Sequence, residues 1–128
     1  MPPPSPDNQR MSPLLWIAGG SGITPFLAMS SFLTTLPVDL RPSVHLLYAC
    51  RAETHSLLEK IDPAALSNVT VFESPKRRMC EEDVRAVEGV SGRLVFVCGP
   101  PILVADSQQW LERVGVPPLQ VRTEDFTF

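Results

Sequence analysis

The chain has 128 residues, of which 44% are hydrophobic, a length that suits a single domain with its own core. Its formal net charge of -3 at pH 7 gives no reason to expect nucleic acid or anionic lipid as a partner. The three cysteines lack a C-x-x-C spacing and no apolar run is long enough for a bilayer, so we expect no metal, no disulfide framework and no transmembrane segment. A soluble protein of a reducing compartment, cytoplasm or mitochondrion, is predicted, although the sequence does not say which.

Residues 1–12 combine four prolines with mostly polar residues. Such a stretch has too little apolar surface to offset the entropy lost on ordering. It predicts a flexible tail or linker, which another domain could precede, and it leaves residues 13–128 as the folded domain.

A strand, a tight turn and a helix follow in residues 14–26. The apolar run Leu14 to Ala18 predicts the strand, three glycines follow within residues 19–22, and a helical pattern begins near Thr24. Pro25 fits the first helical turn, where its missing amide is not needed. Glycine permits positive φ and lets a ligand approach the backbone closely, and the free amides of a helix's first turn bind anions. We therefore expect a phosphate as the ligand. We expect valine at Gly20 or Gly22 to block that phosphate; a tight turn without ligand is the alternative.

Strand and helix patterns then alternate to the end of the chain. Strands are predicted over residues 44–49, 69–72, 94–98 and 119–122, and helices over residues 26–36, 57–61, 80–87 and 103–114. Gly115 is placed to end the last helix. This alternation predicts an α/β fold: an open, doubly wound parallel sheet of five strands with helices on both faces.

Three motifs carry a family resemblance. They are Gly19-Gly20-Ser21-Gly22-Ile23-Thr24-Pro25, Cys98-Gly99-Pro100-Pro101 and the ending Glu124-Asp125-Phe126-Thr127-Phe128. Together, and in this order, they resemble the pyridine-nucleotide domain of the ferredoxin-NADP reductase and cytochrome b5 reductase superfamily. The resemblance implies the strand order 3-2-1-4-5, with the first two motifs at the point where strand order reverses and where ligands sit in such sheets.

The resemblance also implies roles for individual residues. Residues 19–25 and 99–101 would bind NAD(P)H, and Cys98 would lie near the nicotinamide as the catalytic residue. Glu124 and Phe126 would shape the nicotinamide pocket. The alternatives are an inert buried Cys98, a Thr24 that only caps its helix, and a Phe126 that packs under the domain.

Basic residues favour NADP over NAD. Arg51 follows the second strand, where an NAD-selective domain commonly has an acid, and Lys76, Arg77 and Arg78 follow the third strand. These four cations, Arg51 and Arg77 among them, could therefore converge on a 2′-phosphate. A solvated basic turn is the alternative.

Reductases of this superfamily carry FAD on an amino-terminal barrel, and no motif of such a barrel is found here. We therefore expect an NAD(P)H-binding module of a flavin-dependent oxidoreductase, inactive alone, whose flavin-binding domain is supplied in cis or trans; the electron acceptor stays unknown. The first alternative is a non-catalytic nucleotide-sensing or protein-interaction domain of the same fold. The second is an α/β domain that binds no nucleotide.

Overall fold

The sheet has the predicted topology. A computed structural model describes residues 11–124, which leaves Phe126 and most of the expected tail outside the described residues. Five parallel strands lie in the order β3-β2-β1-β4-β5. Their bounds are β1 Leu14–Gly19, β2 Val44–Cys50, β3 Asn68–Glu73, β4 Leu94–Cys98 and β5 Val121–Glu124.

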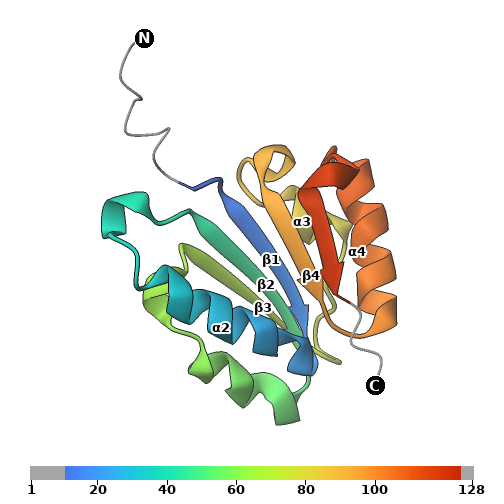
Figure 1. Cartoon of the computed structure of the whole chain (residues 1–128). Coiled ribbons are helices and arrows are strands. Elements are labelled where there is room, and N and C mark those ends of the chain that lie inside the picture. The colour runs from blue at the N-terminus through green and yellow to red at the C-terminus, as the bar shows by residue number, and fades with distance from the viewer. Residues whose placement is uncertain (1–10, 125–128) are drawn as a thin grey trace.

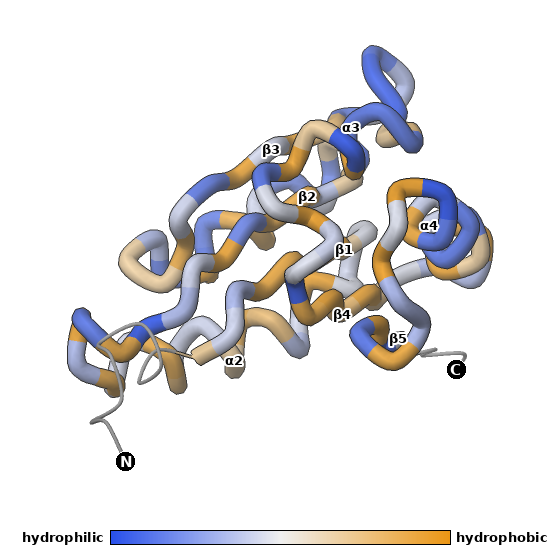
Figure 2. The backbone as a smooth tube through the Cα atoms, turned by 90° about the horizontal axis from the view of Figure 1, so that it is seen from above, coloured by the Kyte–Doolittle hydropathy of each residue, from blue (hydrophilic) through white to orange (hydrophobic). Residues whose placement is uncertain are grey.

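Helices cover both faces of the sheet, as predicted. The α-helices are α2 Thr24–Leu33, α3 Glu81–Arg85 and α4 Pro101–Arg113. The 3-10 helices are η1 Gly20–Ile23, η2 Val38–Leu40, η3 Ala52–Lys60, η4 Pro63–Ala65, η5 Val90–Gly92 and η6 Pro118–Gln120. Helix α2 lies on one face, and α3 and α4 lie on the other (Figure 2).

The central strand β1 is buried throughout because both of its faces are covered. Trp16 and Ala18 belong to the core under α2, whereas Leu15 and Ile17 belong to the core under α3 and α4. Trp16 stacks on Phe26 of α2 with ring centroids 5.1 Å apart. Apolar residues at every position of a strand are what a parallel sheet covered on both sides requires.

Three predicted elements differ from the observed ones. The predicted helix at 57–61 is a 3-10 helix, η3, and α2 ends at Leu33 instead of 36. The hydroxyls of Thr34 and Thr35 donate to carbonyls one turn back, at 2.8 and 2.6 Å, which offers the backbone an alternative to further helix. The last strand begins at Val121 because the prolines before it form η6, which leaves Leu119 86% exposed.

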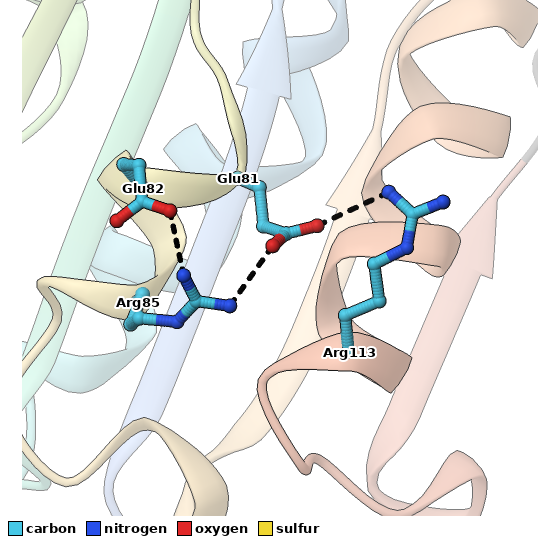
Figure 3. A network of polar contacts seen from close by, with 4 residues as sticks. All are labelled: Glu81, Glu82, Arg85 and Arg113. Carbon is cyan, nitrogen blue, oxygen red and sulfur yellow. Dashed lines mark hydrogen bonds and ion pairs between the residues drawn. The ribbon is translucent and has the colours of Figure 1, made fainter.

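Helix α3 is joined to α4 by an ion pair. The carboxylate of Glu81 accepts from Arg85 at 2.9 Å and from Arg113 of α4 at 3.1 Å (Figure 3). The hydrogen bond from Arg113 holds the pKa of Glu81 below its ordinary value; partial burial opposes this and Arg85 adds to it. Glu81 thus lies in the first turn of α3, where an acid suits the helix dipole, and it also binds the neighbouring helix.

Candidate functional site

Two of the predicted motifs meet at the carboxyl edge of the sheet. The glycine turn (residues 19–24) follows β1, and the Cys-Gly-Pro loop (residues 98–101) ends the neighbouring strand β4. Both α2 and α4 begin at this edge (Figure 1). A Cβ atom added to Gly22 would lie 2.4 Å from the carbonyl oxygen of Cys98, and one added to Gly99 would lie 3.0 Å from the amide nitrogen of Gly19. The two loops therefore touch backbone to backbone, at the point where strand order reverses.

The three glycines of the turn differ in what surrounds them. A Cβ on Gly19 would lie 2.6 Å from the Leu103 side chain, and one on Gly22 would strike Cys98. Gly20 alone has positive φ, +53°, and a Cβ there would meet nothing within 4 Å. Gly20 is thus the glycine of this turn that faces open space. The expectation that a side chain on Gly22 would block a phosphate is wrong in its reason, because that side chain would first strike the other loop.

The residues that follow the glycines make contacts within the protein. The Thr24 hydroxyl donates to the Ser21 carbonyl at 2.8 Å, and the N-cap of α2 is Ile23, without a side-chain cap. The interpretation of Thr24 as a helix cap is therefore wrong. Pro25 does occupy the first turn of α2. Ile23 is fully buried, whereas Ser21 and Thr24 are exposed.

Cys98 is buried at the end of β4. Its side chain is 1% exposed and belongs to the core under α2. Pro101 begins α4, and both Pro100 and Pro101 are exposed at the edge of the sheet. Glu124 pairs in register with Cys98 at the end of β5, which brings the backbone of the first residue of the third motif to the same edge. A role for the buried thiol in hydride exchange stays a prediction.

Tyr48 is a site residue that sequence reasoning missed. It lies fully buried on β2, and its hydroxyl lies 2.8 Å from the Gly20 carbonyl oxygen and 3.0 Å from that of Thr54 in η3. Burial raises the pKa of this phenol; the hydrogen bond to Thr54 acts the other way, and Cys50 adds to the rise. A signal was present in the sequence: Tyr48 is the chain's one tyrosine and lies two residues before the end of a mostly apolar strand.

The ends of β2 and β3 lie side by side, with Cys50 in register with Glu73. Arg51 is exposed, and no carboxylate among residues 11–123 lies within ion-pair distance of it. Arg77, in contrast, is ion-paired with Asp83, and its guanidinium lies 5.1 Å from the centre of the Phe72 ring. Of the two arginines, Arg51 is thus available to a 2′-phosphate, whereas the guanidinium of Arg77 is already bound by Asp83.

An acid not foreseen from the sequence also lies at this end. The Glu73 carboxylate is 3.6 Å from Nδ1 of His55. Burial raises the pKa of the Cys50 thiol, and the charge of Glu73 raises it further. Within the part of the chain that the structure describes, no helix is long and apolar enough to cross a membrane. The same residues form no cluster of three potential metal ligands.

These features define the class of protein: an open, doubly wound α/β domain in which a glycine turn and a second loop meet at the topological switch point. No family model matches the chain. The electron transfer component of 2-halobenzoate 1,2-dioxygenase from Burkholderia cepacia is 28% identical over 130 residues, which cover 92% of this chain and 38% of that protein.

Solved structures agree on the fold. Flavohemoglobin from Malassezia yamatoensis, bound to FAD and heme, aligns with a TM-score of 0.71 at 22% identity over 96% of this chain and 34% of its own. The ferredoxin reductase of carbazole 1,9a-dioxygenase aligns at 0.67 with 20% identity, over 91% of this chain and 38% of its own. The chain is thus similar, in sequence and fold, to the pyridine-nucleotide domain of the ferredoxin-NADP reductase and cytochrome b5 reductase superfamily, and the predicted resemblance is confirmed. It spans little more than a third of the length of the relative from Burkholderia.

Proposed function

We propose that this chain is the NAD(P)H-binding module of a flavin-dependent oxidoreductase. It would present the nicotinamide to a flavin held by another domain, in the same polypeptide or in a separate one. The observation that carries the proposal is the backbone contact between Gly22 and Cys98, because it brings the glycine turn and the Cys-Gly-Pro loop together at the ligand-binding edge of the sheet.

The residues at this edge fit a dinucleotide. Gly20 leaves open space above the turn, and amides at the start of a helical segment favour a pyrophosphate. Gly99 lets the second loop approach the glycine turn closely, and the nicotinamide end would lie at this second loop. NAD(P)H, when bound, supplies the hydride that reduces a flavin. This chain's residues would bind it, orient it and keep water from it.

We further propose a preference for NADPH, resting on Arg51. Its side chain is exposed at the end of β2 and has no carboxylate partner among the described residues. Arg77 would contribute less, because Asp83 already binds its guanidinium. Glu73 at the end of β3 opposes the preference, since an acid there repels a 2′-phosphate and can accept from a ribose hydroxyl.

A second candidate function, a protein-interaction domain, is favoured by one apolar surface. A groove of about 390 Å³ lies between α2 and β4, lined by apolar side chains that include Trp16, Phe32 and Phe96. Phe32 is 58% exposed, and large exposed apolar patches often mark interaction sites. Both candidate functions allow a flavin-binding partner on this face; only the first also requires dinucleotide binding.

Two measurements on the purified, flavin-free protein separate the candidates. NADPH fluorescence should rise and saturate as protein is added, while ferricyanide reduction stays at the buffer rate because no flavin is present to split the hydride into single electrons. Binding without oxidation supports the binding module. Absence of any fluorescence change leaves only the interaction domain, and turnover without flavin contradicts both.

A further inference from the structure

The hydroxyl of Tyr48 lies between two carbonyl groups from different segments. It is 2.8 Å from the Gly20 oxygen in the glycine turn and 3.0 Å from the Thr54 oxygen in η3. A phenol has one proton and donates to one of these oxygens at a time. The ordinary pKa of a tyrosine is 10.0 and burial raises the pKa of Tyr48 further, so the phenol keeps this proton at neutral pH. A single buried group thus fixes the glycine turn against the segment that begins after Arg51.

The bond to Gly20 determines which way one peptide group points. The Gly20 carbonyl points toward Tyr48, in the interior. In a trans peptide the N–H of the next residue points opposite to the carbonyl, so the Ser21 amide points away from Tyr48. Ser21 is exposed and Gly20 faces open space, so this amide is directed to the side on which a ligand would lie.

We propose that Tyr48 is a positioning residue for the pyrophosphate of the dinucleotide: it holds the Gly20–Ser21 peptide with its amide toward the phosphate and its carbonyl away. This inference rests on the proposed function. Without the hydroxyl, the Gly20 carbonyl would lose its buried donor. Glycine has the conformational freedom to let this peptide rotate. Rotation would present a carbonyl oxygen to the phosphate, and the two would repel each other.

The test compares Tyr48→Phe with a matched control, using ADP as the probe because it carries the pyrophosphate without the nicotinamide. The control, Ser30→Ala, also removes a buried hydroxyl that donates to a carbonyl, that of Leu27 at 2.8 Å, but away from the turn. Calorimetry well below the melting temperatures should show ADP affinity lowered about tenfold or more in Tyr48→Phe and unchanged in Ser30→Ala. A merely structural role of the hydroxyl would lower the melting temperature of both variants and leave both affinities intact.

A second readout leaves the hydroxyl in place. Tyr48 is the chain's one tyrosine, so 3-fluorotyrosine labelling gives a single 19F signal that reports on it. Addition of ADP should shift this signal, with the dissociation constant found by calorimetry. An unmoved signal in protein that binds ADP, or equal affinity in Tyr48→Phe, overturns the positioning role and leaves the proposed function standing. Failure of the unaltered protein to bind ADP overturns the proposed function itself.

Discussion

Gly22 and Cys98 are in contact through their backbones, and a Cβ atom on Gly22 would lie 2.4 Å from the Cys98 carbonyl oxygen. Backbone on both sides cannot move aside as a flexible side chain would. We therefore expect Gly22→Ala to lower the free energy of unfolding by about 1–3 kcal/mol, the usual cost of overpacking. Urea denaturation followed by circular dichroism measures this change. An alanine variant as stable as the original protein would mean that the two loops are not held together.

Gly20 offers the complementary variant. Its φ of +53° is one that asparagine tolerates better than other side chains, and its Cβ position is open. Gly20→Asn should thus keep most of the stability while placing a side chain where a phosphate would approach. We expect ADP binding to fall at least about tenfold with less than about 1 kcal/mol lost in unfolding. Undiminished binding would place the phosphate elsewhere.

Arg51 is expected to distinguish the two cofactors. A charge-assisted hydrogen bond is worth roughly 1.5–3 kcal/mol, so Arg51→Ala should weaken NADPH binding about tenfold or more and leave NADH nearly unchanged. Arg77→Ala should cost less selectivity, because Asp83 engages that guanidinium. Dissociation constants for both cofactors provide the measurement. Equal losses for NADH and NADPH in Arg51→Ala would remove the basis for the NADPH preference.

Arg93 is expected to stabilise the edge of the sheet opposite the site. It is 8% exposed and donates to the carbonyls of Leu14 at 2.7 Å and Glu88 at 2.8 Å. Arg93→Met would leave these acceptors without their donor, and we expect it to cost about 2 kcal/mol or more of unfolding free energy with ADP affinity intact. Arg41→Met, which removes two similar but less buried bonds, should cost less. The reverse order in urea titrations would contradict this assignment.

Asp83 should make the stability depend on pH in the acid range. Burial tends to raise its pKa, but hydrogen bonds from Arg77 and the Cys80 amide hold the pKa below the ordinary 3.8. A lowered folded-state pKa gives stability that is complete above the ordinary pKa and is lost as the pH falls through the folded-state value. Between about pH 5 and about pH 3, Asp83→Asn should therefore lose less stability than the original protein. An Asp83→Asn variant that loses as much stability as the original protein over this range would contradict the assignment.

Much of the fold could be predicted because its signals are local. An apolar run bounded by glycine, such as Leu14 to Gly19, indicates a buried parallel strand without knowledge of its neighbours. The 3-10 form of η3 was not predicted, because apolar spacing over residues 57–61 does not distinguish it from an α-helix. The late start of β5 follows from Pro117 and Pro118, a local signal that the prediction did not use.

The site was predicted in outline and missed in its details for a similar reason. The glycine turn and the Cys-Gly-Pro loop are both visible as motifs. That Gly22 packs on Cys98 while Gly20 faces open space depends on a contact between residues far apart in the chain. The same holds for the Tyr48 bond to Gly20 and for the pairing of Arg77 with Asp83.

The most direct test of the central claim is isothermal titration of the flavin-free protein with NADPH, with Gly20→Asn measured alongside. The proposed function predicts saturable binding of one dinucleotide per chain, lost or strongly weakened in a folded Gly20→Asn variant. No heat of binding with NADPH, and none with NADH, would contradict it, and so would equal affinity in the variant.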